Sequence, residues 1–330
     1  MALREDVATR VDLTQVRTAA GRLLSGSGPL IGLLVLAVVL SVLSPAFLTV
    51  GNLFNVFQQI AVLATLALGV TAVIITAGID LSVGSVLGLG GAVAGWTFAV
   101  AGWPMGLAIV AGLGVGALAG LINGLLITYG RLPPFVATLA MLSMARGAAL
   151  VVTDGRPISG YPGWFRLIAT HDVFGFLPAS VVLVVVLYLL GAAYLRYRPA
   201  GRALYAIGGN EQVARLSGIN VRRAKIKVYT MAGLLAGLGG LLLVARLNSA
   251  QPNAGFTLEL DVIAAVVIGG ASLRGGAGTV SGTLVGALII GVLRNGLNLL
   301  GVSSFWQQIV IGAVIAIAVM TDTLRKRDQT

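Results

Sequence analysis

The strongest constraint on this chain is a series of long apolar segments separated by short breaks rich in glycine and proline. They lie at about 29–43, 53–77, 84–101, 104–129, 134–153, 179–195, 226–248, 258–271, 279–299 and 303–322. A helix of about 20 apolar residues crosses the hydrocarbon core of a bilayer. No segment shows the apolar–polar alternation of a barrel strand, so helices must satisfy the backbone there. The sequence predicts an all-α integral membrane protein of about ten transmembrane helices in one domain.

Composition excludes several other classes of protein. Only 10% of the 330 residues are charged, against about 25% in typical soluble domains, and so few charges cannot cover a soluble surface of this size. The chain has no cysteine and a single histidine, His171, which we place in a solvated loop. Disulfides, thiolate chemistry and cysteine-ligated metals are therefore excluded, and we expect no catalytic residue, metal site or cofactor in this chain.

The net charge of +11 predicts membrane orientation and not nucleic-acid binding. A basic soluble protein suggests a nucleic-acid partner, whereas Lys and Arg of membrane proteins gather in cytoplasmic loops. With the N-terminus inside, 17 of the 22 Lys and Arg fall in cytoplasmic segments, two in external loops and three within spans. We therefore predict that both termini are cytoplasmic.

These segments divide the chain into three regions. Residues 1–28 form a cytoplasmic N-terminal segment that ends in a flexible Ser–Gly stretch, 29–322 a transmembrane domain, and 323–330 a cytoplasmic tail. No cleavage site follows an early apolar run, so the first span is predicted to be retained. The span at 104–129 is rich in glycine, which lets helices approach closely; its glycines are Gly106, Gly112, Gly114, Gly116, Gly120 and Gly124.

A polar, glycine-broken stretch at 77–85 separates two apolar segments. We expect Asp80 to act as the N-cap of the following helix, with a role in the transport pathway as the alternative. Residues 79–91 also align without gaps on 258–270. Because these would start the third and eighth spans from opposite sides, the alignment suggests a five-plus-five inverted repeat, which is common in transporters.

The largest cytoplasmic loop, at 198–224, contains a second informative stretch. Asn210 is placed to cap a short helix, Val213 and Leu216 share one face, and Gly218 is placed to end it. Such a helix either docks a soluble partner or lies on anionic lipid, and the basic residues that follow it at 222–227 favour lipid.

Three stretches carry a resemblance that covers nearly all of the chain after residue 28. They are AGIDLSVGSVLGLGGAVAG at 77–95, GRALYAIGGNEQVARLSGINVRRAKIKVYTMAG at 201–233 and DVIAAVVIGGASLRGGAGTVSGTLVGALIIGVLRNGLNLLG at 261–301. Together they resemble the membrane permease family of bacterial ABC importers for ribose, xylose and related monosaccharides.

The resemblance implies a multi-pass protein of the bacterial inner membrane that pairs with a second copy of itself. It also implies a cytoplasmic ATPase subunit and an extracytoplasmic sugar-binding protein as partners. Within the loop 198–224, it makes Gly208, Asn210, Glu211, Ala214, Arg215 and Gly218 the segment that couples to the ATPase. No phosphate-binding G-x-x-x-x-G-K-[ST] run occurs in this chain, so ATP and Mg are expected on the partner.

Polar residues within spans are candidates for the sugar pathway. The predicted set is Asn55, Gln58, Gln59, Asp80, Ser82 and Asn295. Amides and hydroxyls can exchange hydrogen bonds with sugar hydroxyls, but they also tie helices together, and for any single residue the structural role is the stronger alternative.

Arginines on the external side are candidates for docking the binding protein. Arg146, Arg246 and Arg294 fall in the outer halves of spans, and Arg156 and Arg166 in an external loop. We expect some of these five to meet acidic residues of the docked protein. The alternative is that the three within spans extend to external lipid headgroups.

Other transport classes remain open from the residues alone. An ion-coupled secondary transporter would also have glycine breaks and inverted repeats. An ABC permease for branched-chain amino acids or nucleosides is the closest competitor. A membrane enzyme or scaffold is disfavoured because no paired carboxylates, triad or metal cluster is present.

Overall fold

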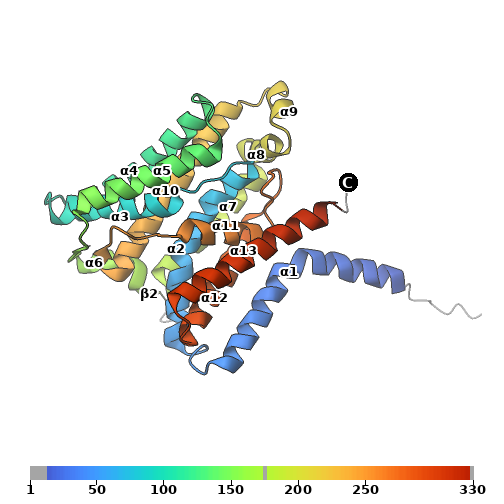
Figure 1. The fold of residues 1–330 in the computed structure, drawn as a ribbon, viewed down its shortest axis with the longest axis horizontal. Helices are drawn as coiled ribbons and strands as arrows, with labels where there is room; N and C mark the ends of the chain where they lie inside the picture. Colours follow the sequence, from blue (N-terminus) through green and yellow to red (C-terminus); the bar gives the residue numbers. More distant parts are fainter. Residues whose placement is uncertain (1–12, 174–176, 328–330) are drawn as a thin grey trace, which may run out of the picture.

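The computed structural model describes residues 13–173 and 177–327, and helices dominate it (Figure 1). The helices that match the predicted spans are α1 Leu13–Leu43, α2 Val50–Ile75, α3 Val83–Ala99, α4 Met105–Thr128, α5 Pro134–Thr153, α7 Ala179–Tyr197, α10 Val221–Leu247, α11 Leu258–Ile268, α12 Val280–Leu299 and α13 Ser304–Arg327. The remaining elements are α6 Gly163–Thr170, α8 Pro199–Gly209, α9 Glu211–Leu216, β1 Ile158–Ser159, β2 Asp172–Val173, β3 Leu177–Pro178 and β4 Ser249–Ala250.

Each of the ten predicted apolar segments coincides with a helix, but the helices differ in length. Within the described residues, α2, α4, α5, α7, α10 and α12 are long and apolar enough to cross a membrane. The apolar parts of α1, α3 and α13 are shorter, and α11 has 11 residues. The chain is thus a helical membrane protein with six clear candidate spans in this part, and the number ten stays a prediction.

The N-terminal region differs from expectation at the Ser–Gly stretch 25–28. This stretch, predicted to be flexible, lies inside α1, which is continuous from Leu13 to Leu43 and contains Pro29. A glycine costs a helix only about 1 kcal/mol, whereas starting a second helix requires a new unfavourable nucleus. Residues 1–12 and 328–330 of the predicted cytoplasmic segments lie outside the described residues.

Helices α2 and α10 pack against each other at the centre of the bundle. Helix α10 also packs on α3 and α4, and α2 packs on α11 and α12. In Figure 1, α3, α4 and α5 accordingly lie to one side of this pair, and α1, α12 and α13 to the other. The two central helices contribute much of the buried apolar core, including Leu66, Val70 and Ile74 of α2 and Leu242 of α10.

Glycines allow α4 and α10 to touch backbone to backbone. Gly112, Gly116, Gly120 and Gly124 recur every four residues, so they share one face of α4, and a Cβ on any of them would meet α10 or α3 backbone. On Gly120 it would collide with the carbonyl of Tyr229. The close approach predicted from the sequence is confirmed for these four positions, whereas Gly106 and Gly114 have open space.

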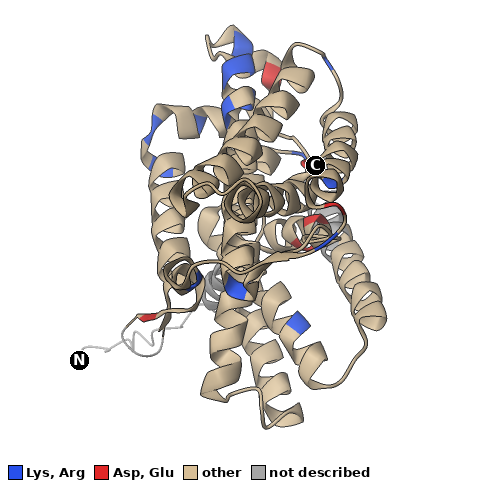
Figure 2. Cartoon of the chain, turned by 90° about the vertical axis from the view of Figure 1, so that its left-hand side faces the viewer, with Lys and Arg blue, Asp and Glu red and all other residues tan. Residues whose placement is uncertain are grey.

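The two ends of the bundle carry different small elements. At one end lie α8 and α9. At the other, β1 pairs antiparallel with β4, with Ile158 opposite Ala250, and α6 packs on α7 and α10. In Figure 2 the blue ribbon segments, which mark Lys and Arg, are most frequent in the upper part of the molecule, where Figure 1 labels α8 and α9.

Candidate functional site

Helix α9 forms as the sequence predicts. The backbone N–H of Val213 donates to Oδ1 of Asn210 at 3.0 Å, which makes Asn210 the N-cap. After Leu216 the chain turns through Gly218 with a φ of 83°, a left-handed conformation that glycine adopts without a Cβ penalty. A cap at one end and a glycine at the other therefore fix a six-residue helix that is too short to be stable alone.

One face of α9 is anchored and the other is free. Ala214 is buried, and it packs with Ile207 of α8 and Val221 of α10. Val213 and Leu216 are 57% and 89% exposed. The anchored face of α9 thus holds the helix against α8 and α10, and its other face presents two apolar side chains outward.

The charges around α9 are partly used within the chain. Glu211 Oε2 accepts from Lys225 Nζ at 2.6 Å, and Oε1 accepts from Arg215 at 2.9 Å. The hydrogen bond from Lys225, with the nearby positive charges, lowers the pKa of Glu211. Arg222 lies over the ring of Tyr129, 5.5 Å from its centroid. Lys225 and Arg222 of the basic stretch are thus engaged with protein groups, which weakens the case for a lipid-binding patch.

Helix α8 connects α9 to the spans. A Cβ on Gly208 would collide with the carbonyl of Ile75 at the end of α2 and with the backbone of Gly276. Gly276 N–H itself donates to the Ile75 carbonyl at 2.9 Å, and the Tyr205 hydroxyl donates to the carbonyl of Gly278 at 3.0 Å. Helix α8 is therefore in direct contact with the end of α2 and with the α11–α12 connection.

Asp80 does not cap α3 in the way the sequence suggests. The helix begins at Val83, and the cap position is Ser82, whose side chain makes no capping bond. Asp80 Oδ1 instead accepts from the N–H of Ser82 at 2.8 Å and from its hydroxyl at 2.6 Å. A short aspartate side chain readily bonds to the backbone two residues on, which stabilises the turn before the helix. The prediction of Asp80 as N-cap is thus wrong by two residues.

The other predicted pathway residues are mostly engaged in helix-to-helix ties. Asn123 Nδ2 donates to Ser82 Oγ at 3.0 Å, and Gln58 Nε2 donates to the carbonyl of Ala169 at 3.3 Å. Asn295 and Asn52 exchange two amide hydrogen bonds, at 2.7 and 3.0 Å. Asn55 has an exposed side chain. The structure therefore does not gather the six predicted residues around one space.

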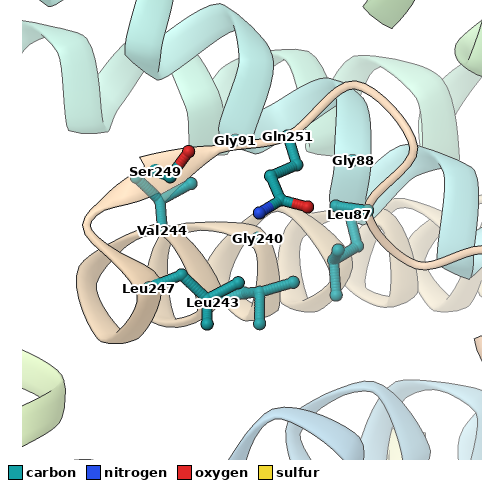
Figure 3. Close-up of a pocket in the computed structure, with 10 residues that line it drawn as sticks. Leu87, Gly88, Gly91, Gly240, Leu243, Val244, Leu247, Ser249 and Gln251 are labelled. Carbon is teal, nitrogen blue, oxygen red and sulfur yellow. The ribbon is translucent and has the colours of Figure 1, made fainter. Parts of the chain in front are cut away.

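Gln59 lines a cavity of about 240 Å³ between α2, α10, α11 and α12. The cavity is apolar apart from one amide, one carboxylate and two guanidinium groups; its lining residues are Gln59, Val62, Leu63, Leu243, Arg246, Gly255, Phe256, Leu258, Asp261, Gly291 and Arg294. A second cavity lies between α3 and α10, where Gln251 extends toward Gly240 (Figure 3). Its volume of about 10 Å³ leaves room for one water at most.

The five predicted docking arginines divide into two groups. Arg156 and Arg166 are exposed, and Arg156 lies 4.0 Å from Asp154. Arg246 and Arg294 line the large cavity, and the guanidinium of Arg146 lies 5.0 Å from the ring centroid of Phe256. Of the three arginines predicted within spans, Arg246 and Arg294 therefore face the cavity, and Arg146 lies against the ring of Phe256.

Sequence reasoning missed Asp261, the partner of one of these arginines. Its side chain is 2% exposed, and its Oδ2 lies 2.5 Å from Nη2 of Arg294. A signal was present, because an arginine and an aspartate both occur within predicted spans and each requires a partner in hydrocarbon.

Comparisons with known proteins agree with one another. The model of a family described as "Branched-chain amino acid transport system / permease component" matches residues 52–319. The chain is 48% identical to the ribose import permease protein RbsC of Escherichia coli K12 over 90% of this chain and 93% of that protein. It is 50% identical to RbsC of Bacillus subtilis 168, over 89% and 92% of the two chains.

A further relative extends the range of named substrates. The xylose transport system permease protein XylH of Escherichia coli K12 is 37% identical over 86% of this chain and 87% of its own. No solved structure matches the chain.

Proposed function

The chain belongs to this family of transport-system permease components, and we propose that it forms the membrane pathway of an ATP-driven, binding-protein-dependent importer of monosaccharides. Its nearly full-length similarity to permeases named for ribose and xylose supports the substrate class. The energy source is an ATPase on another chain, which holds ATP and Mg. The coupling to that ATPase is the part that the geometry supports best.

The observation that carries this proposal is the construction of α8 and α9. An exposed apolar face, Val213 and Leu216, sits on a helix that is capped, ion-paired and packed against α10. Gly208 joins that unit to the end of α2 and to the loop before α12. In our proposal the ATPase covers α9, and its closure on ATP moves α2 and α11 through these backbone contacts.

We also propose ten spans arranged as a five-plus-five inverted repeat, in which α1–α5 correspond to α7 and α10–α13. The packing supports it: α10 contacts α3 and α4, and α2 contacts the counterparts α11 and α12. The local alignment of 79–91 with 258–270 gives weaker support, because α3 begins four residues later in that alignment than α11 does. The functional pore is a dimer of two copies in the bacterial inner membrane, in contact with lipid and with both termini cytoplasmic.

Docking of the extracytoplasmic sugar-binding protein is proposed for the exposed arginines Arg156 and Arg166. They lie beside the β1–β4 pair and on α6, at the end of the bundle opposite α9. Reversal of either charge should weaken the stimulation of ATP hydrolysis by the binding protein. Arg146, Arg246 and Arg294 are left out of this docking surface, since Arg146 lies against Phe256 and the other two line the large cavity.

Reconstitution tests the function directly. The chain would be placed in proteoliposomes with candidate ATPase and sugar-binding subunits of its source organism, and uptake of labelled ribose, xylose and leucine would be measured. We expect uptake of a pentose that requires ATP, the ATPase and the binding protein. Uptake of leucine alone would place the chain with amino-acid permeases, and pentose uptake abolished by an uncoupler while ATP persists would indicate a secondary transporter.

A further inference from the structure

The 240 Å³ cavity has the composition of a small-ligand site. Most of its lining is apolar, and Gln59, Arg246, Asp261 and Arg294 supply a few polar groups. Sites for small molecules combine an apolar wall with a few placed polar groups in this way, and drug-sized ligands occupy about 300–1,000 Å³. This cavity is slightly smaller, which suits a single ring and not an extended chain.

The polar groups of the cavity have unused hydrogen-bonding capacity. Asp261 contacts Arg294 Nη2, but Nε of Arg294 is buried without a hydrogen-bond partner. Among the described residues, Arg246 has neither an ion pair nor a side-chain hydrogen bond. A carboxylate offers about four acceptor sites and a guanidinium five donors. The wall therefore presents both acceptors and donors to whatever occupies the cavity.

The cavity lies beside a helix, α11, that also reaches the coupling segment. It lies at the start of α11, where a non-helical stretch, 251–257, precedes the helix, and α11 packs on both α2 and α12. The far end of α11 leads into the loop that contacts Gly208, so the same helix borders the cavity and the coupling segment.

We propose that this cavity binds one uncharged, polyhydroxylated ring, a monosaccharide in transit, within the permease itself. Asp261 accepts from sugar hydroxyls, Arg246 and Gln59 donate to them, and Phe256 covers the apolar face of the ring at the cavity rim. A hydroxyl both donates and accepts, so it uses both kinds of group in the wall. Asp261 and Arg294 compensate each other, so an anion would pair with Arg246 and leave the acceptors of Asp261 unused, whereas a neutral polyol uses both kinds of group. This inference rests on the proposed function and adds a second selection step after the binding protein.

The absence of cysteine from the natural chain makes a direct test simple. Val62 lines the cavity and is 6% exposed, whereas Asn55, two turns earlier on α2, is exposed and outside the lining. The variants Val62→Cys and Asn55→Cys would be placed in nanodiscs without partners. The rate of modification by a small neutral methanethiosulfonate would then be measured with and without millimolar ribose, xylose, ribose 5-phosphate or leucine.

We expect ribose or xylose to slow modification of Val62→Cys several-fold and to leave Asn55→Cys unchanged. Adding Gln59→Ala to Val62→Cys should abolish the protection while the reaction without sugar continues. Leu258→Cys is the second cavity position if Val62→Cys does not fold. Equal rates with and without sugar at both cavity positions, or protection by leucine or the phosphate in place of the neutral sugars, would overturn the proposal.

Failure of this inference is distinguishable from failure of the proposed function. If reconstituted complex imports a pentose but no neutral sugar protects Val62→Cys or Leu258→Cys, the cavity assignment is wrong and the importer function stands. If the complex imports leucine and no sugar, and leucine protects the cavity cysteines, both the proposed substrate class and this assignment are wrong.

Discussion

At the scale of single residues, the pairing of Asp261 with Arg294 is the most consequential contact in the structure. Asp261 is almost fully buried, and a lone carboxylate in that position would be strongly unfavourable. The ion pair with Arg294 offsets the cost of burying the carboxylate. Both side chains keep atoms that can form further hydrogen bonds. A buried pair contributes little net stability compared with apolar residues of similar size, but removal of one partner leaves an uncompensated charge.

Removal of either charge should therefore destabilise the protein more than exchange of both. We expect Arg294→Gln to lower the free energy of unfolding by about 3 kcal/mol, because Asp261 then lacks its partner. The swapped variant, Asp261→Arg with Arg294→Asp, should recover part of that loss. Thermal unfolding in detergent checks this, and a swapped variant no more stable than Arg294→Gln would contradict it.

Only part of this residue-level chemistry is predictable from sequence. Gln59, Arg246 and Arg294 can be identified because polar groups within apolar segments are conspicuous. Which of them share a cavity depends on how helices turn against each other. Gln58 and Gln59 are neighbours in sequence, yet one bonds to the carbonyl of Ala169 and the other lines the cavity.

At the scale of elements, the α4–α10 contact and the α8–α9 unit depend on glycine for different reasons. Along α4, glycine at every fourth position removes the side chains that would keep two backbones apart. In α8, Gly208 lets a cytoplasmic helix meet the backbone ends of two spans. The four-residue spacing in α4 is visible in sequence, whereas the partners of Gly208 are distant in the chain and could not be inferred.

Paired alanine substitutions on α4 measure the close contact. Gly120→Ala introduces a Cβ that collides with the Tyr229 carbonyl, and such overpacking typically costs about 1–3 kcal/mol. Gly114→Ala adds the same methyl group to open space, and it should be neutral or slightly stabilising, since alanine favours helix by up to about 1 kcal/mol. Unfolding in detergent compares them, and equal stability of the two variants would argue against tight α4–α10 packing.

A second pair of variants tests mechanical coupling through α8. Gly208→Ala should force α8 away from Ile75 and Gly276, whereas Gly209→Ala has nothing within 4 Å of the added Cβ. We expect Gly208→Ala to reduce uptake and binding-protein-stimulated ATP hydrolysis several-fold and Gly209→Ala to resemble the natural protein. The amount of folded permease bound to ATPase should be measured in parallel. Normal stimulation in Gly208→Ala would show that this contact does not transmit the motion.

At the scale of the whole molecule, the sequence locates the helices but not their neighbours. Helices α2 and α7 have nearly the same mean hydropathy, 2.0 and 2.1, yet 83% of the apolar window of α2 is buried in the protein against 22% for α7. Lipid tails and a neighbouring helix are equally apolar, so hydropathy cannot separate a central helix from a peripheral one. The placement of α2 and α10 at the centre therefore comes from the structure alone.

Orientation is the whole-molecule property that charge does predict. Because basic residues are retained on the cytoplasmic side, the end that carries α9 should face the cytoplasm and the end that carries α6 should face outside. Ser217, beside α9, and Asp172, beside α6, are both exposed, and the chain has no cysteine to interfere. A membrane-impermeant maleimide should label Asp172→Cys in intact cells and Ser217→Cys only after permeabilisation. The unsubstituted chain is the control, and labelling of Ser217→Cys alone in intact cells would reverse the orientation and, with it, the sides assigned to the ATPase and the binding protein.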